Sequence, residues 1–203
     1  MECPDFSHEQ TALASGCQII CGIDEAGRGP WAGPVVAAAV ILDPANLPKG
    51  LNDSKKLSAG QREALFEPIN QSAWVGIGIA GVDRIDRDNI LAATLWAMAA
   101  ALRQLGTTAD LALVDGNRAP ELPCPVLTII GGDGKSLSIA AASIIAKVTR
   151  DRLMIALDAE LPGYGFARHK GYGTAAHRLA LARLGPSIQH RKSFAPIARL
   201  LGR

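Results

Sequence analysis

Two apolar runs, at residues 17–23 and 35–42, flank a polar, glycine-rich segment that begins with Asp24 and Glu25. Apolar runs of this length, separated by glycines, are typical of two strands joined by a tight turn. The pattern places two carboxylates and Arg28, which stands between Gly27 and Gly29, at one end of a sheet. An arginine between glycines can reach a phosphate or a sugar with its backbone close behind it. We therefore expect function at this end of the sheet.

The remainder of the chain alternates between short apolar runs and longer segments with helical periodicity. We expect further strands at residues 74–82, 111–114 and 126–130, and helices at residues 59–70, 89–105, 139–157 and 175–184, with a short one near the C-terminus. Ser58, with Gln61 three residues later, predicts a capping box at the first of these helices. Residues 83–88 and 164–174 are expected to be connections. Three strands followed by strands interleaved with helices predict an α/β fold, a mixed sheet with helices packed on its faces.

The size and composition of the chain are those of an ordinary globular protein. With 203 residues, 48% hydrophobic and 20% charged, it can bury a full core, and we expect a single domain over residues 1–203. Its longest apolar stretches, residues 31–42 and 90–102, are shorter than the roughly 18 residues that a membrane helix needs. The acidic residues 1–5 lack the basic and apolar regions of a signal peptide. The four cysteines show no CxxC pair and no zinc spacing. We expect a soluble, non-secreted, cytoplasmic protein with reduced, structural thiols.

The charge of the chain is strongly segregated. Residues 161–203 contain eight of the 21 Lys and Arg residues and no Asp or Glu, which leaves 13 basic against 19 acidic residues in the rest. A cationic end of this kind indicates either a polyanionic partner or a solubilising basic helix, and charge alone does not separate the two.

Four carboxylates, those of Asp24, Glu25, Asp115 and Asp133, stand where apolar runs end. For any single aspartate a turn or cap role is more common, but three such strand ends together favour a cation site. Carboxylate oxygens select Mg²⁺ or Mn²⁺, and two such ions about 4 Å apart can support phosphodiester hydrolysis. Neighbouring strand residues point to opposite faces, so Asp24 and Glu25 can share a site only if the chain bends. We therefore expect Glu25 at or beyond the strand end.

The basic C-terminal region contains other residues with chemical potential. His169, His177 and His190 are each as suited to contact phosphate or solvent as to catalyse. Tyr172 lies between two glycines in a basic loop, where an aromatic ring can stack on a base or a sugar. Without other evidence, the preferred interpretation is that Tyr172 packs this loop against the rest of the protein. Asp151 lies about five helical turns from Asp133 and is not expected in the site.

Several segments, in one order and spacing, resemble bacterial ribonuclease HII over residues 20–196. They are DEAGRGP at 24–30, DSKKL at 53–57, VDGN at 114–117, GD at 132–133, AASIIAKVTRD at 141–151, HKGYGT at 169–174 and HRKSF at 190–194. Several long motifs in a fixed order are far more specific than any one of them. Trp31 departs from the smaller aliphatic residue more usual at its position, which leaves the packing beside the glycine turn open.

The resemblance implies a ribonuclease H-like fold with a five-stranded mixed sheet and a basic C-terminal helical extension at about residues 161–203. It implies Mg²⁺- or Mn²⁺-dependent endonucleolytic cleavage of RNA in RNA–DNA hybrids and 5′ to single ribonucleotides in duplex DNA, for ribonucleotide removal, leaving 5′-phosphate and 3′-hydroxyl ends. The four acids fall on the family's metal-binding acids. Gly27, Arg28 and Gly29 fall on the turn that reads the 2′-hydroxyl, and Tyr172 falls on the aromatic that stacks at the RNA–DNA junction.

The physical properties of these residues agree with that function. A close-approaching backbone turn is suited to the 2′-hydroxyl, the one group that separates RNA from DNA at a given site. Lys55, Lys56 and the cationic C-terminal segment would hold phosphates without sequence choice. A monomer suffices for this chemistry.

Two other functions remain open from the residues. A nuclease or resolvase of the same fold that acts on DNA junctions would not need the Gly27–Gly29 turn or Tyr172, and it would cut an all-DNA substrate. A non-catalytic hybrid-binding protein would have lost at least one acid, and none of the four is missing.

Overall fold

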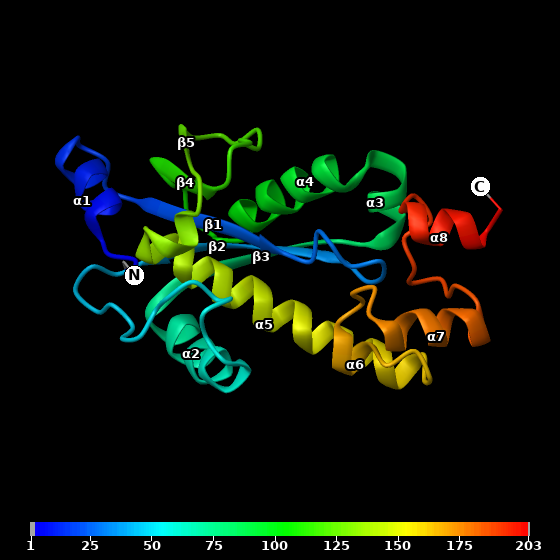
Figure 1. Ribbon diagram of the computed structural model, residues 1–203. Coiled ribbons are helices and arrows are strands. Elements are labelled where there is room, and N and C mark those ends of the chain that lie inside the picture. The colour runs from blue at the N-terminus through cyan, green and yellow to red at the C-terminus, as the bar shows by residue number, and fades with distance from the viewer. Residues whose placement is uncertain (1–2, 203) are drawn as a thin grey trace.

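The computed structural model describes residues 3–202 and arranges them in three layers, with a β-sheet between two sets of helices (Figure 1). Met1, Glu2 and Arg203, which belong to the acidic N-terminus and the basic C-terminal segment considered above, lie outside the described residues. The sheet has the strand order β3-β2-β1-β4-β5. The strands are β1 (Ile20–Ala26), β2 (Val35–Leu42), β3 (Ala73–Ala80), β4 (Leu111–Asp115) and β5 (Val126–Ile129). Because β1 pairs antiparallel with β2 but parallel with β4, the sheet is mixed, as predicted.

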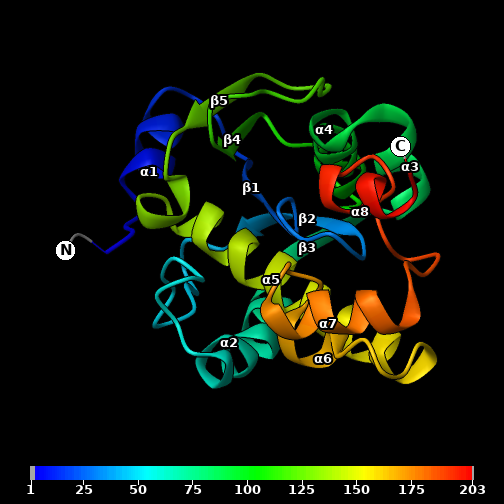
Figure 2. The same cartoon turned by 45° about the vertical axis from the view of Figure 1, so that its right-hand side comes forward.

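The two faces of the sheet are covered by different helices (Figures 1 and 2). One face packs against α4 (Ile90–Arg103) and α3 (Val82–Asp88), and the other against α5 (Leu137–Glu160) and α2 (Ala59–Ser72). The remaining helices are α1 (Ser7–Ala14), α6 (Phe166–His169), α7 (Ala175–Leu184) and α8 (Ala195–Leu200). No helix within residues 3–202 combines the length and apolar character needed to cross a membrane. The predicted α/β fold is confirmed.

The starts of the predicted helices are set by side-chain caps. Ser58 and Gln61 form the expected capping box at α2, and the Asn89 side chain accepts hydrogen bonds from two backbone N–H groups of α4. The Ser136 side chain caps α5. The small residues 140–142 are fully buried on that helix, which lets it lie close to the sheet.

Three segments differ from the prediction. Residues 82–88 form α3 rather than a connection, because Val82 and Ile85 are buried and override the polar character of their neighbours. A four-residue helix, α6, interrupts the loop expected at residues 164–174. The N-terminal helix α1 was not predicted at all, since its residues have no clear apolar face.

The anchor of α1 is Glu9, a fully buried carboxylate. One of its oxygens accepts hydrogen bonds from the Ser136 hydroxyl and, at 2.9 Å, from the Ser138 N–H at the first turn of α5. A negative charge at a helix N-terminus satisfies donors that have no partner within the helix. Glu9 thus connects the start of the chain to the helix that supports the sheet.

We expect Glu9→Ala to lower the free energy of unfolding by about 2 kcal/mol, because it leaves buried N–H and hydroxyl donors without an acceptor. Urea unfolding followed by circular dichroism measures this. Gln10→Ala, at the exposed neighbouring position, is the matched control and should change stability by less than about 0.5 kcal/mol. Equal effects of the two variants would contradict the anchoring role.

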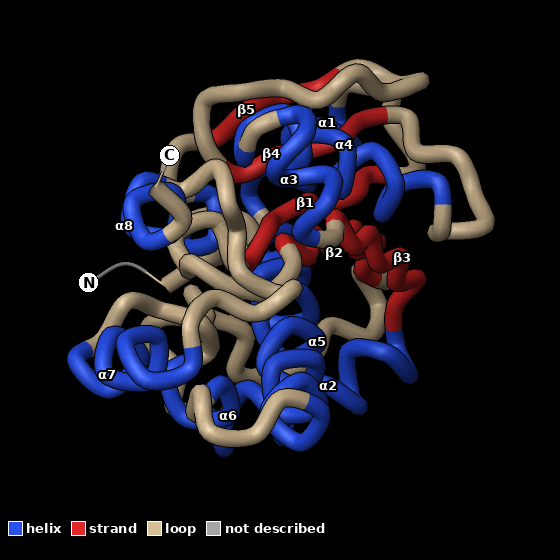
Figure 3. The backbone as a smooth tube through the Cα atoms, turned by 90° about the vertical axis from the view of Figure 1, so that its right-hand side faces the viewer, coloured by secondary structure: helices blue, strands red, loops and turns tan. Residues whose placement is uncertain are grey.

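The C-terminal helices bracket the end of the sheet where β1 leads into β2 (Figures 2 and 3). Helices α6 and α7 lie beside the C-terminal half of α5, whereas α8 lies on the other side, next to α3. The segment before α8 is attached to α3 by Asp86, whose carboxylate accepts hydrogen bonds from the N–H groups of Lys192 and Ser193 at 3.0 and 2.9 Å. The loop at residues 27–34 therefore lies between two attached parts of the C-terminal segment.

Candidate active site

Asp24 and Glu25 lie on opposite faces of β1. Asp24 shares the α5 face with Gly22, and Glu25 lies with Leu91 and Thr94 of α4 around a cavity on the other side. The expectation that the chain bends and leaves Glu25 at or beyond the strand end is wrong. Strand β1 continues through Ala26, and Glu25 pairs with Ala37 of β2. Both carboxylates nevertheless line one cavity of about 250 Å³, because it opens at the strand ends, where both faces are accessible.

The other two acids reach the same region from β4 and from the turn after β5. Asp115 is the last residue of β4, and its carboxylate accepts a hydrogen bond of 2.7 Å from the Gly132 N–H. Asp133 lies in the single 3₁₀ turn at Gly132–Gly134 and is 5% exposed. Parallel strands bring their carboxyl ends to one edge of a sheet, so Asp115 and the residues after β5 meet near Asp24.

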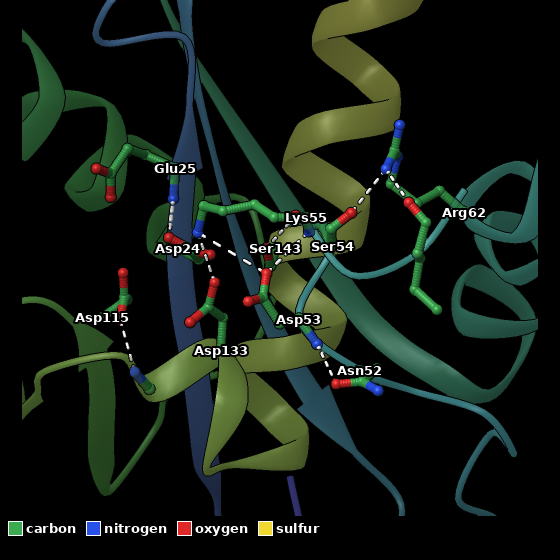
Figure 4. Close-up of polar contacts among 12 residues, drawn as sticks. Asp24, Glu25, Asn52, Asp53, Ser54, Lys55, Arg62, Asp115, Asp133 and Ser143 are labelled. Carbon is green, nitrogen blue, oxygen red and sulfur yellow. Dashed lines mark hydrogen bonds and ion pairs between the residues drawn. The ribbon is translucent and has the colours of Figure 1, made fainter. Parts of the chain in front are cut away.

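A lysine lies among these carboxylates (Figure 4). Lys55 Nζ is 2.7 Å from Asp133 Oδ2 and 3.9 Å from Asp53 Oδ1. Figure 4 shows the carboxylate of Glu25 turned away from this pair. Within residues 3–202, no three His, Cys, Asp or Glu side chains are grouped tightly enough to hold a metal ion in this arrangement. Asp24, Glu25 and Asp115 line the cavity together with Lys55, whose ammonium group links this lining to Asp133.

Burial and mutual repulsion raise the pKa values of Asp24, Glu25 and Asp115. Burial raises the pKa of Asp24 well above 3.8, and the charges of Glu25 and Asp115 raise it further. Burial likewise raises the pKa of Glu25 and of Asp115. Burial alone lowers the pKa of Lys55, but the Asp133 hydrogen bond and the surrounding carboxylates together raise it. A cluster of this kind is stabilised by added positive charge, and its all-oxygen donor set suits a hard divalent cation.

Comparison with known proteins identifies the family of this chain. The family model described as ribonuclease HII matches residues 21–197. Ribonuclease HII of Azorhizobium caulinodans is 60% identical over 95% of this chain and 74% of its own length. The crystal structure of ribonuclease H2 from Pyrococcus horikoshii OT3 superposes with a TM-score of 0.76 at 27% identity, covering 92% of this chain and 98% of that one. A structure of Bst-RNase HIII in complex with Mn²⁺ has a TM-score of 0.69 at 19% identity, over 94% of this chain and 71% of that one, and so shares the fold.

The chain belongs to the ribonuclease HII family. It is an endonuclease that cleaves RNA in RNA–DNA hybrids by hydrolysis of phosphodiester bonds, and the activity of the family depends on a divalent metal. The resemblance stated from the sequence motifs is confirmed, as is the ribonuclease H-like fold.

The glycine turn of this ribonuclease HII chain is longer than predicted. β1 and β2 are joined by the eight residues 27–34 rather than by a tight hairpin turn. Arg28 and Gly29 are exposed at the rim of the cavity, and Arg28 Nη1 is 3.3 Å from Glu25 Oε1. Gly29 faces the ring of Tyr172, since a Cβ at that position would be 3.5 Å from Tyr172 Cε1. The loop and the aromatic ring therefore form one rim.

Tyr172 is 48% exposed and lines the cavity together with the acids, so its ring is not packed into the body. The neighbouring Trp31 does pack. Its indole covers Gly173, where a Cβ would be 2.1 Å from a ring carbon, and its ring centroid is 5.8 Å from that of His177. Trp31 thus holds residues 170–174, which carry Tyr172 and are called the tyrosine loop below, against the loop at residues 27–34.

The three C-terminal histidines are buried and their ring nitrogens bond to protein groups, so they do not face solvent as one of the sequence expectations had it. The hydrogen bonds assign their tautomers. The Ser187 N–H donates to His190 Nδ1, so His190 Nε2 carries the proton and donates to His177 Nε2 at 3.0 Å. His177 Nδ1 then donates to the Tyr172 carbonyl at 2.9 Å. With both rings neutral, every donor in this series of hydrogen bonds has an acceptor. The series ends at the backbone carbonyl of Tyr172, whose ring lines the cavity.

This arrangement predicts a pH dependence of stability. Burial and the neighbouring His177 lower the pKa of His190 from 6.5 to about 4. The unfolded chain therefore binds a proton that the folded chain does not, and stability is lost as pH falls from 6.5 to about 4. We expect His190 alone to contribute about 3 kcal/mol to this loss.

Urea unfolding at several pH values across this window tests the prediction. His190→Gln should be less stable than wild type at pH 7 and should lose less stability on acidification. His8→Gln, on the partly exposed face of α1, is the control and should follow the wild-type profile. A His190→Gln profile parallel to wild type would contradict the prediction.

Some residues that line the cavity were not singled out from the sequence. They are Arg62, Lys147 and Arg150, which add three basic side chains to the lining. A signal existed for Arg150, which follows the buried Ala142 and Ala146 at intervals of four residues and so occupies the inward face of α5. Lys56, in contrast, is exposed and does not line the cavity, although its ammonium group lies near Gly134.

Proposed function

We propose that this chain also incises duplex DNA on the 5′ side of single embedded ribonucleotides and so acts in ribonucleotide removal. Hydrolysis would leave a 5′-phosphate and a 3′-hydroxyl. The observation that carries the proposal is that three carboxylates, the Gly27–Gly29 loop and the exposed Tyr172 ring line one cavity. The fourth carboxylate, that of Asp133, is bonded to the cavity-lining Lys55. One ribonucleotide presents one 2′-hydroxyl, so a single reading loop beside a single cutting site suffices.

Asp24, Glu25, Asp115 and Asp133 would hold two divalent ions, Mn²⁺ or Mg²⁺. Bound ions of this kind supply an activated water and stabilise charge on the leaving oxygen. The acids fit this role because all donors are carboxylate oxygens, and because burial raises the pKa values of Asp24 and Asp115, so that a bound cation would stabilise their charged forms. The Mn²⁺ complex of the structurally similar ribonuclease HIII supports the choice of ion.

The Gly27–Gly29 loop would read the 2′-hydroxyl. Within residues 3–202, the N–H groups of Arg28 and Gly29 donate no hydrogen bond to another residue, so both remain available to a substrate oxygen. A deoxyribose offers no hydroxyl at this place, and the donors would then lack that partner. The Arg28 guanidinium, held toward Glu25, adds a cation at the same rim.

Tyr172 would stack on the nucleotide that follows the ribose, since its ring is half exposed beside Gly29. Lys55 and Lys56 would bind phosphates. The ammonium group of Lys55 is bonded to the carboxylate of Asp133, and that of Lys56 lies next to the turn that carries Asp133. The basic residues of 161–203, among them the exposed Arg178 and Arg183 of α7, would hold the duplex backbone.

We further propose that residues 1–203 act as one domain, with residues 161–203 as its basic helical extension, and that the protein works as a cytoplasmic monomer. The attachment of the C-terminal segment on both sides of the 27–34 loop supports the single domain and the monomer, because one chain then supplies every part of the cavity.

A labelled DNA duplex that carries one ribonucleotide, with an all-DNA duplex as control, tests the proposed function in Mg²⁺ or Mn²⁺. Wild type should make a single incision 5′ to the ribonucleotide and leave the control intact, and Asp115→Asn should abolish the cut. Cutting of both duplexes would point to a resolvase-like nuclease. Binding without cutting by wild type would leave a hybrid-binding protein.

A further inference from the structure

Two arginines outside the carboxylate cluster are almost completely buried. Arg150 of α5 is 1% exposed, and Arg191, which precedes α8, is 0% exposed. Within residues 3–202, no carboxylate forms a salt bridge with either of them. A buried charge is costly unless its hydrogen bonds are satisfied. Both guanidiniums donate to main-chain carbonyls, and most of these belong to the loop at residues 27–34.

Arg191 holds both ends of that loop. Its Nη2 donates to the Gly27 carbonyl at 2.6 Å, and its Nη1 donates to the Arg28 carbonyl at 2.9 Å. At the other end, Nε and Nη2 donate to the Gly33 carbonyl at 3.0 and 2.8 Å. A guanidinium is planar and presents its donors in a fixed fork, so these contacts fix the orientation of the peptide groups and not only their position. Burial lowers the pKa of Arg191 to about 9, so the group is still charged at neutral pH.

The planarity of the peptide bond carries this orientation to the cavity side. In a trans peptide the carbonyl of one residue and the N–H of the next point in opposite directions. Since the Gly27 and Arg28 carbonyls point toward Arg191, the N–H groups of Arg28 and Gly29 point away from it. These are the two amides that donate to no other residue within residues 3–202, and both residues line the cavity that contains Asp24.

Arg150 holds a different part of the same region. It donates to the carbonyls of Pro34, Ala32 and Lys170 at 2.9, 3.2 and 3.1 Å, and to neither Gly27 nor Arg28. It therefore joins the end of the loop to the tyrosine loop without orienting the two free amides. The chain thus contains two equally buried arginines with carbonyl partners, of which one orients the reading amides.

We propose that Arg191 is the positioning residue for ribose discrimination: it orients the free N–H groups of Arg28 and Gly29 toward the substrate by holding the carbonyls behind them. This inference rests on the proposed function of the loop. A lysine in place of Arg191 keeps the charge but has one ammonium group without the planar fork, so it cannot hold the carbonyls at both ends of the loop in fixed directions.

The test is the ratio of two dissociation constants, measured by fluorescence anisotropy with Ca²⁺ in place of the catalytic ion. The first probe is a labelled all-DNA duplex, and the second is the same duplex with a single ribonucleotide. Wild type should bind the second more tightly, and Arg191→Lys should reduce this preference about tenfold while binding to all-DNA changes less than about twofold. A merely structural role would lower the fraction of active protein and leave the ratio unchanged.

Arg150→Lys is the matched control, because it makes the same substitution at an equally buried arginine. It should lose stability but keep the ribonucleotide preference within about twofold of wild type. An unchanged ratio in folded Arg191→Lys, or an equal loss of preference in both variants, would overturn the positioning role of Arg191 and leave the proposed function intact. A wild type without any preference would overturn the proposed function and, with it, this inference.

If Arg191→Lys does not fold, amide NMR of the wild-type protein provides the second measurement. The Arg28 and Gly29 amide signals should shift more with the ribonucleotide-containing duplex than with the all-DNA duplex. Equal shifts would overturn the inference without any variant.

Discussion

Asp24→Asn is expected to abolish cleavage and, at the same time, to make the metal-free protein more stable. Cleavage should fall by at least about 10²-fold, since the site would lose one of the carboxylates proposed to hold the metal ions. Stability should rise because burial and the neighbouring Glu25 and Asp115 raise the pKa of Asp24, so its charge opposes folding. The asparagine oxygen can still accept the 2.7 Å hydrogen bond from the Glu25 N–H.

The sign of the pH effect follows from the raised pKa. The folded protein binds the Asp24 proton more tightly than the unfolded chain does, so wild-type stability falls as pH rises above 3.8 and through the folded-state pKa. The stability gain of Asp24→Asn should therefore be largest at neutral pH and should vanish below about pH 4. Thermal unfolding without metal measures it, with about 2–4 °C in Tm for each kcal/mol.

Asp110→Asn is the control of opposite sign. The Asp110 carboxylate accepts hydrogen bonds from the Gln18 and Ile19 N–H groups at 2.8 and 2.9 Å, and these lower its pKa. Its replacement should not increase stability and should leave cleavage unchanged. Added Mn²⁺ should raise the Tm of Asp110→Asn as it does that of wild type, and that of Asp24→Asn much less. Retained cleavage in Asp24→Asn would remove this residue from the site.

Gly22→Ala is expected to have the largest effect on the fold. A Cβ at Gly22 would lie 2.1 Å from the Ser138 carbonyl carbon and 2.3 Å from the Ile139 nitrogen. These are backbone atoms of the first turn of α5, so no side chain can rotate to make room. We expect a loss of at least about 3 kcal/mol in the free energy of unfolding, since overpacking of a close helix–strand contact moves the backbone. Cleavage should also fall, because Asp133 lies four residues before the start of α5 and would move away from Asp24.

Chemical denaturation and the cleavage assay together measure this result. Gly60→Ala is the matched control, because Gly60 lies in α2 with open space around it. It should stabilise the protein by up to about 1 kcal/mol, as alanine is a better helix former, and it should not alter cleavage. A Gly22→Ala protein as stable as wild type would show that α5 does not depend on this close approach.

The elements that the sequence predicted well are those with local signals. Alternating apolar runs and side-chain caps gave the strands and the starts of α2, α4 and α5 to within a few residues, because periodicity and capping depend on neighbours in the chain. The acids were also recognisable, since an Asp or Glu at the end of an apolar run lies at a sheet edge wherever the strand is placed. Order and spacing of the motifs then identified the family.

The tertiary structure decided how those residues face one another. Asp24 and Glu25 occupy opposite faces and still share a cavity, which depends on where the strands end relative to α4 and α5. The burial of the histidines, the position of Lys55 among the acids and the carbonyl partners of Arg191 all come from segments far apart in the chain. The sequence pattern around a polar residue does not reveal its partners when these are carbonyls and carboxylates from distant segments. The sequence alone thus determined the strands, the helices and the acids at the strand ends, whereas only the packing of distant segments determined which cations meet those acids and how the loop at residues 27–34 is held.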